Sequence, residues 1–178
     1  MLVRLTKLPD TGAALRALEE IFFLSTTRTS FPSDKARAAF FHTWTGWYLE
    51  NEPWDVWFWR DPDGSFGGYL TGCLDSMDAE GLFKTLPKYG VFDDLFPRYP
   101  AHLHVNVHPN RRGHGIGQKL VERFVQDCIA EEVPGVHVVT AHAMRNVGFY
   151  NRLGFTDAVL RKPLLFLGRP LNTTPGTR

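Results

Sequence analysis

The spacing of hydrophobic residues predicts that the chain begins with one short strand and two helices. Leu2–Leu8 alternates loosely between apolar and polar residues, which is typical of a strand. Apolar residues recur at intervals of three and four over Asp10–Leu24 and again over Ser33–Leu49, and this spacing predicts two helices. Ser33 follows a proline and is expected to cap the second helix.

The next segment is expected to form a hairpin followed by a long loop. Trp54–Arg60 and Ser65–Cys73 flank the turn sequence Asp61-Pro-Asp-Gly64, which predicts two antiparallel strands. Asp75–Pro100 is rich in Gly, Pro and Asp, and it is interpreted as a loop with one short helix. Loops of this length within a compact domain usually serve a function.

The C-terminal half predicts strands and helices in alternation. Strands are expected over Ala101–Val107 and Val136–Ala141, and an amphipathic helix over Gly115–Glu131 lies between them. A short helix over Met144–Leu153 should end at a glycine, and Phe155–Leu167 should hold one or two strands broken at a proline.

This order of elements predicts an α/β (α+β-like) fold, with a mixed sheet and helices packed on it. The length of 178 residues suits one domain, which we place over residues 1–167. The tail, residues 168–178, carries Pro, Gly and Thr and is expected to be frayed.

The composition gives no support for a nucleic-acid-binding, membrane-spanning or secreted protein. The formal net charge is +1, which gives no reason to expect a nucleic-acid or anionic-membrane partner. No apolar run approaches the roughly 20 residues of a membrane span, and the N-terminus lacks the apolar region of a secretory signal. The two cysteines, Cys73 and Cys128, form no paired motif, so we expect a reducing, cytoplasmic setting.

All five tryptophans lie between Trp44 and Trp59. They can belong to the core or line a substrate pocket, since apolar pockets favour aromatic side chains. Both interpretations can hold together.

The most informative stretch is Val107-His-Pro-Asn-Arg-Arg-Gly-His-Gly-Ile-Gly117, in which a predicted strand gives way to a predicted helix. The first amide groups of a helix lack internal partners, and glycines let the backbone approach an anion closely. Arg111, Arg112 and Lys119 add positive charge nearby. This pattern predicts a phosphate-binding turn, although a glycine-rich turn without a ligand remains the alternative.

Two common phosphate motifs fail here. The Walker A motif is absent because no glycine pair has the required spacing before Lys119, and the dinucleotide fingerprint is absent because Gln118 replaces its last glycine. The pattern [Q/R]-x-x-G-x-[G/A] is satisfied by Arg112, Gly115 and Gly117. A second motif, Phe149-Tyr-Asn-Arg-Leu-Gly-Phe155, follows about 35 residues later.

Together, these two motifs resemble motifs A and B of the GNAT acetyltransferases over Ala101–Phe155. The resemblance implies the GNAT fold, a central mixed, largely antiparallel twisted sheet with helices on both faces. It also implies that acetyl-CoA is the co-substrate, that an amine-bearing acceptor attacks it directly in a ternary complex, and that no metal takes part. A homodimer is left open.

The resemblance assigns roles to individual residues. Tyr150 would protonate the leaving thiolate, which suits a phenol that is still protonated at neutral pH. The backbone of Val105 and Val107 would pair with the pantetheine arm. The remaining cofactor contacts would come from Arg112, Gly113, His114, Gly115, Ile116, Gly117, Asn146 and Phe149.

The general base is not assigned. The positions usual for a base fall on Ala101 and Leu103, which cannot titrate, so His102, His104 and Asn106 stay as candidates together with a water. Histidine has the right pKa for a base, but a hydrogen-bonded core residue is the commoner interpretation of each histidine.

Other departures and alternatives affect single residues. Ala143 stands where the family often has Asn, which puts one cofactor contact in doubt. A metal site among His102, His104, His108 and His114 is disfavoured, because no neighbouring Cys or acidic residue completes it.

A finer resemblance links Tyr99–Val107 to the acetyltransferase-like domain attached to O-GlcNAc hydrolases and to its free-standing bacterial relatives. Some of those relatives are suspected of binding without catalysis. An acyl-CoA-binding module without turnover is therefore the alternative function.

The acceptor is not identified by the sequence. By resemblance its pocket would be built from Ser33–Tyr48 and Asp75–Pro100. Acidic residues of the second segment could attract a cationic amine, although surface solvation explains them as well. They are Asp75, Asp78, Asp93 and Asp94.

Overall fold

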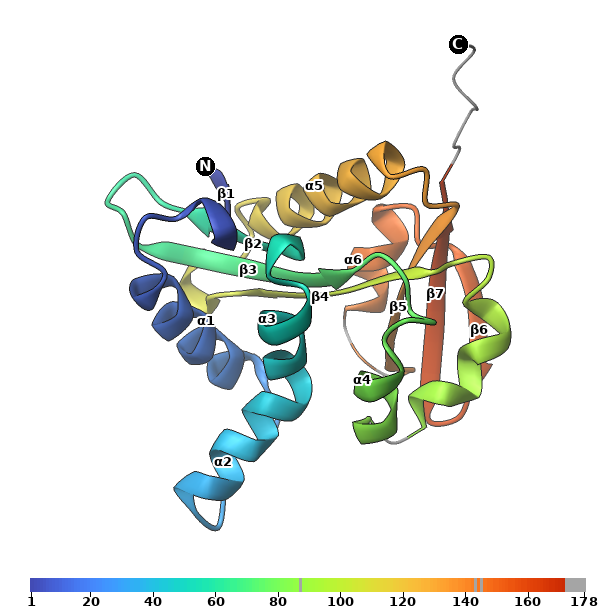
Figure 1. Ribbon diagram of the computed structural model, residues 1–178, viewed down its shortest axis with the longest axis horizontal. Helices are drawn as coiled ribbons and strands as arrows, with labels where there is room; N and C mark the ends of the chain where they lie inside the picture. The colour runs from blue at the N-terminus through green and yellow to red at the C-terminus, as the bar shows by residue number, and fades with distance from the viewer. Residues whose placement is uncertain (87, 143, 145, 172–178) are drawn as a thin grey trace. The chain divides into compact units, whose positions relative to one another are not determined.

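A computed structural model describes residues 1–86, 88–142, 144 and 146–171, and Figure 1 shows the course of the chain. The chain divides into two compact units, each made of two segments. The first unit is formed by Met1–Gly72 and His104–Phe124, and the second by Cys73–Leu103 and the chain from Val125 onward. Each unit is described by itself.

The elements follow one another in an order close to the predicted one. The first half contains β1 (Leu2–Arg4), η1 (Leu5–Lys7), α1 (Gly12–Ser25), α2 (Asp34–Phe41), η2 (His42–Gly46), α3 (Trp47–Asn51), η3 (Pro53–Asp55), β2 (Val56–Arg60) and β3 (Phe66–Cys73). The second half contains α4 (Glu80–Thr85), η4 (Tyr89–Leu95), β4 (Ala101–Val107), η5 (Pro109–Arg111), α5 (Ile116–Ala130), β5 (Gly135–Ala141), α6 (Val147–Arg152), β6 (Asp157–Arg161) and β7 (Leu164–Pro170).

The strands hydrogen-bond in the order β1-β2-β3-β4-β5-β7-β6. Neighbours β1–β2, β2–β3, β5–β7 and β6–β7 are antiparallel, whereas β4 and β5 run parallel. The predicted mixed, largely antiparallel sheet is confirmed.

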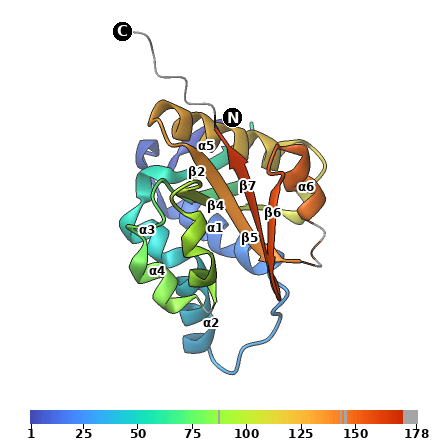
Figure 2. The same ribbon diagram turned by 90° about the vertical axis from the view of Figure 1, so that its right-hand side faces the viewer.

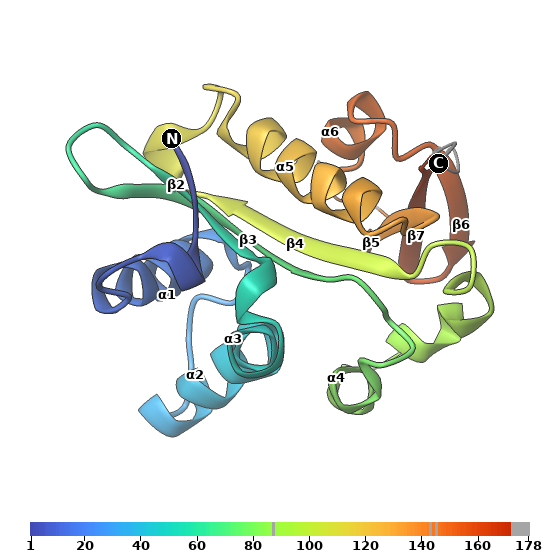
Figure 3. The same ribbon diagram turned by 45° about the horizontal axis from the view of Figure 1, so that its top comes forward.

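In the first unit, helices cover both faces of the strands (Figures 1 and 3). On one face, α1 buries Leu18 and Ile21 against Phe58 and Tyr69 of the hairpin strands. On the other face, the first half of α5 lies so close to β3 that a Cβ at Gly72 would stand 2.3 Å from the Phe124 ring. Glycine at this position therefore lets the helix approach the strand.

The second predicted helix is interrupted. Ser33 caps it as expected, since its Oγ accepts a hydrogen bond from the amide of Ala36 at 3.2 Å. The middle of the segment, η2, is a π-helix that separates α2 from α3. The apolar spacing was compatible with a continuous α-helix, and it carried no signal for the extra residue that a π-turn holds.

In the second unit, β5, β7 and β6 form a sheet with α4 on one side and α6 on the other (Figure 2). The core of this unit contains a stack of rings in which His137 lies between Phe96 and Phe166, at centroid distances of 5.2 and 4.6 Å. Tyr150 of α6 packs against Phe155, which is fully buried.

Three expectations for element ends were wrong. The first strand ends at Arg4 and is followed by a 3-10 turn. The segment predicted as a loop with one short helix holds both α4 and η4. Strand β7 runs to Pro170 because it pairs with β5 over its whole length, so the expected tail begins later. Residues 172–178 lie outside the described part.

Among the described residues, no helix has both the length and the hydropathy that a membrane crossing requires.

Candidate functional site

The glycine loop joins β4 to α5 within the first unit. The strand ends at Val107, a short 3-10 turn covers Pro109–Arg111, and the helix begins at Ile116. Gly113 and Gly115 have φ angles of +81° and +74°, which is the left-handed region that favours glycine. The sequence pattern predicted this turn, and the backbone requires its glycines.

The main-chain amides of this turn are not used by the protein. Lys119 is the first residue of the helix whose amide finds an acceptor, the carbonyl of Gly115 at 3.0 Å. Within the described residues, the six amides from Gly113 to Gln118 donate no hydrogen bond to the protein. Such a run of N–H groups at a helix N-terminus is a binding site for an anion.

The turn is accessible. Residues 109–115 are exposed, and a Cβ built on Gly113 or Gly115 would meet no atom within 4 Å. Ile116 is the exception, since it is buried and its side chain packs over Gly68 of β3. The buried Ile116 anchors the start of the helix, and the turn before it is exposed.

The two arginines of the loop are held by the protein. Arg111 forms an ion pair with Asp61 of the hairpin turn, with Nε donating to Oδ2 at 2.9 Å. Arg112 donates from Nε to the carbonyl of Val107 at 3.2 Å and from Nη2 to Ser25 Oγ at 3.4 Å. One donor group of Arg111 and two of Arg112 therefore brace the turn, and the expectation that both side chains supply charge to a phosphate stays a prediction.

His114 also braces the turn. Its Nδ1 donates to the carbonyl of Arg112 at 2.9 Å. Its neighbour His108 accepts from the amide of Asn110 through Nδ1 at 3.2 Å. These two of the four histidines considered as metal ligands are thus explained by local hydrogen bonds, and the described residues contain no cluster of three or more metal-ligating side chains.

Only the first residues of strand β4 are paired with strand β5. The two strands are paired at Ala101–Val136 and His102–His137 only. Val105 and Val107, the residues expected to pair with pantetheine, lie beyond these pairs and are half-buried.

His102 lies in the core of the second unit. Its side chain is fully buried, and its Nδ1 lies 2.8 Å from Ser76 Oγ. Because that hydroxyl donates to the carbonyl of Pro100 at 2.6 Å, it accepts from the imidazole, which fixes a proton on Nδ1. These contacts are those of a structural histidine, and a role of His102 as a base stays a prediction.

His104 belongs to the first unit and has an unusual environment. Its ring lies edge-on to Trp44 and Tyr48, at centroid distances of 6.3 and 5.7 Å. Its Nε2 is buried and has no hydrogen-bond partner among the described residues. Burial lowers the pKa of His104 to about 4, so the imidazole is neutral at physiological pH.

Asn106 lies two residues further along β4, on the same face as His104. Its Nδ2 donates to the hydroxyl of Tyr69 at 2.9 Å, which orients the amide. An amide does not titrate, so Asn106 can position a group or a water but cannot itself take a proton.

Tyr150 lies on α6 in the second unit, beside Phe149 at a centroid distance of 5.1 Å. Burial raises the pKa of Tyr150 well above its usual value of 10, so the phenol keeps its proton at neutral pH. Its hydroxyl has no hydrogen-bond partner among the described residues, and it is not one of the buried orphan atoms. As far as the described residues go, the hydroxyl keeps a proton that it could donate to a bound group.

Asn146, a further cofactor candidate, accepts a hydrogen bond from Thr140 Oγ1 at 3.1 Å. Ala143, at which the sequence departs from the family pattern, lies outside the described residues.

The acidic residues of the long loop have local explanations. Asp94 forms an ion pair with Arg161, and Asp75 accepts from the amide of Met77 at 2.8 Å. Asp78 and Asp93 are exposed. The suggestion that they attract a cationic acceptor receives no support from these contacts.

A pocket that sequence reasoning did not assemble lies in the first unit, with a volume of about 360 Å³. Its wall includes Trp44 and Asn106, together with the end of α1 and the loop that follows. The tryptophan cluster was a signal for it. Residues about 80 positions apart meet there, however, and this could not be inferred from one local segment.

The comparisons with known proteins agree on one fold. The family model described as "Acetyltransferase (GNAT) domain" matches residues 83–157. The chain is similar to the solved structure of SsHAT, with a TM-score of 0.74, 22% identity, and coverage of 92% of this chain and 96% of that one.

Two further structures extend the comparison. PH1933 from Pyrococcus horikoshii OT3 has a TM-score of 0.70 and 15% identity, covering 97% of this chain and 98% of that one. A GNAT superfamily phosphinothricin acetyltransferase from Sinorhizobium meliloti, solved in complex with AcCoA, has a TM-score of 0.59 and 20% identity, covering 100% and 91%. The predicted GNAT fold is confirmed, and the family match supports acyl transfer in general. The finer resemblance to the domain of O-GlcNAc hydrolases stays a prediction.

Proposed function

We propose that this protein is a GNAT-type N-acyltransferase that moves an acetyl group from acetyl-CoA to a primary amine. The observation that carries the proposal is the run of amides from Gly113 to Gln118, which find no acceptor among the described residues. A diphosphate has the charge and the acceptor oxygens that such a run needs. The match to the GNAT family model and the AcCoA complex of one structural neighbour support acetyl-CoA as this ligand.

In this reaction the acceptor nitrogen attacks the thioester carbonyl carbon. A C–N bond forms, the C–S bond breaks, one proton leaves the nitrogen, and one proton reaches the thiolate of CoA. Such a step depends mainly on positioning and on stabilising the developing negative charge.

The proposal gives each of the following groups of the chain a different role in the reaction. The amides of the loop hold the pyrophosphate, and the backbone of Val105 and Val107 pairs with pantetheine. Tyr150 donates its hydroxyl proton toward the developing thiolate. Since burial makes this phenol a weaker acid than a solvated one, its hydrogen bond to the sulfur should matter as much as full proton transfer.

The proton from the nitrogen needs an acceptor. His104 has lost basicity through burial and Asn106 does not titrate, so a water held by Asn106 is the acceptor that we favour. The lowered basicity of His104 also favours the second candidate function, an acyl-CoA-binding module without turnover.

A substitution at Gly115 tests whether the glycine loop binds the pyrophosphate. Gly115→Glu places a carboxylate and a Cβ where φ is +74°, so acetyl-CoA affinity in calorimetry should fall by a hundredfold or more, on the order of 3 kcal/mol. Gly90→Glu, at an exposed glycine of η4, is the matched control and should bind as the wild type does. Unchanged affinity in Gly115→Glu would remove the basis of the proposal.

A second substitution separates the two functions. Tyr150→Phe should leave acetyl-CoA affinity unchanged and lower kcat by about 100-fold or more in a thiol-release assay over an amine panel, because only the leaving thiolate uses the hydroxyl. Full turnover in this variant would exclude Tyr150 as the acid. Binding of acetyl-CoA by the wild type with no turnover on any amine would favour the binding module.

A further inference from the structure

The pocket in the first unit combines aromatic rings with polar groups and one positive charge. Phe22, Phe40 and Trp44 supply the aromatic surface, and Asn106 of β4 closes one side. Hydroxyl groups and one guanidinium complete the lining, from Ser25, Thr26, Thr27 and Arg28. None of the described residues that line this pocket is acidic.

Arg28 is the charged group, and aromatic rings hold its position. Its guanidinium carbon lies 4.7 Å from the centroid of Phe31 and 5.4 Å from that of Phe40. No carboxylate among the described residues pairs with Arg28. The donors of the guanidinium fork are therefore available to an anion.

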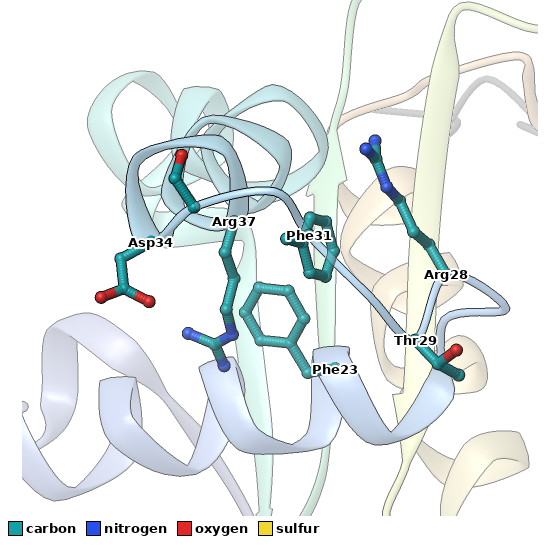
Figure 4. A pocket seen from close by; sticks show the side chains of 7 residues that line it. Phe23, Arg28, Thr29, Phe31, Asp34 and Arg37 are labelled. Atoms are coloured by element: carbon teal, nitrogen blue, oxygen red, sulfur yellow. The ribbon is translucent and has the colours of Figure 1, made fainter.

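A neighbouring arginine shows the contrast. Figure 4 shows a second pocket, of about 450 Å³, in which Arg37 lies against Phe23 and Arg28 extends from the loop on the other side of Phe31. Arg37 pairs with Glu19 at 2.7 Å, so its charge is compensated. Arg28 lines both pockets and has no such partner.

The pocket is also tied to the glycine loop within this unit. Ser25, at the end of α1, lines the pocket and accepts the hydrogen bond from Arg112. Asn106, which also lines the pocket, precedes the loop by a few residues on β4. A molecule in this pocket would thus touch the strand and the helix end that brace the turn.

We propose that this pocket binds the acceptor, and that the acceptor is a small amine carrying a carboxylate next to an apolar or aromatic body. The inference rests on the proposed function and names its substrate class. One arginine fork matches the charge and planar geometry of one carboxylate, and the rings match an apolar side chain. The volume suits a molecule of amino-acid size, and the positive lining disfavours a polycationic peptide.

Binding of reaction products tests this without requiring turnover. In calorimetry with the full chain, N-acetyl-L-phenylalanine should bind about tenfold or more tightly than N-acetyl-L-phenylalaninamide, because only the first carries the carboxylate. Arg28→Gln should abolish the difference by weakening the acid alone. The matched control Arg37→Gln should preserve it, since Arg37 is already paired.

The outcomes are distinct. Equal binding of the acid and the amide, no binding of either at millimolar concentration, or equal losses in the two arginine variants would overturn the inference. Failure of the chain to bind acetyl-CoA would overturn the proposed function instead, and it would leave the difference between acid and amide to be judged on its own. With acetyl-CoA present, kcat/KM for phenylalanine over phenethylamine should drop in Arg28→Gln and persist in Arg37→Gln.

Discussion

At the scale of single residues, the buried imidazole of His104 links stability to pH. Burial lowers its pKa from 6.5 to about 4, because the charged form loses its hydration without gaining a partner for Nε2. At a pH between these two pKa values, His104 is protonated in the unfolded chain and neutral in the folded chain. Stability from this group is thus fully present above pH 6.5 and decreases as the pH falls toward 4.

The expected size of this effect is about 3 kcal/mol. Urea unfolding at pH 7 and pH 4.5 should show a smaller loss of unfolding free energy in His104→Phe than in the wild type. His142→Phe, at an exposed histidine, should retain the full loss. An identical loss in His104→Phe and in the wild type would contradict the burial argument.

The residues of the glycine loop were predictable because their chemistry is local. The φ angles at Gly113 and Gly115 and the unused amides follow from the order of strand, glycines and helix. The pairing of Arg111 with Asp61 was not predictable, since the hairpin turn and the loop are 50 residues apart in sequence. Charge in a sequence does not reveal which charges are already neutralised.

At the scale of elements, the approach of α5 to β3 depends on one glycine. An alanine at Gly72 would put its Cβ 2.3 Å from the ring of Phe124, and the buried ring has no space to move away. Gly72→Ala should therefore lower the free energy of unfolding by about 1–3 kcal/mol in urea titration.

Gly90→Ala is the control for this change, because no atom lies within 4 Å of its added Cβ. Its effect should stay within about 0.5 kcal/mol. Equal effects at the two glycines would show that backbone entropy, rather than the contact with Phe124, determines the result.

Element bounds were predicted best where proline marks them. Ala101–Val107 was predicted with both ends correct, since Pro100 and Pro109 flank it. The extension of β7 to Pro170 was missed because pairing with β5 overrides the Gly and Pro of its sequence. Pairing between segments that are distant in sequence cannot be predicted from the local sequence of either one.

At the scale of the whole molecule, a ligand that binds only the folded chain raises its stability. Acetyl-CoA at 100 times its Kd should add about 2.7 kcal/mol, which corresponds to roughly 5–10 °C in Tm for a chain of this size. Acetyl-pantetheine, which lacks the pyrophosphate, should give a much smaller shift at the same concentration, because the amides from Gly113 to Gln118 would stay unpartnered.

Thermal unfolding with each ligand measures the difference. Equal shifts from the two compounds would mean that the loop contributes little to binding, whatever the rest of the ligand does.

The π-helix from His42 to Gly46 has a consequence for altering acceptor choice. A π-turn accommodates one residue more than an α-turn, so deleting one residue from it would restore an uninterrupted α-helix. Without that deletion, winding the same residues into a regular α-helix would rotate everything before them by about 100° about the helix axis relative to Tyr48. Phe40 would turn away from the wall that it now forms beside Trp44, so the shape of the pocket depends on the length of this helix as much as on its side chains.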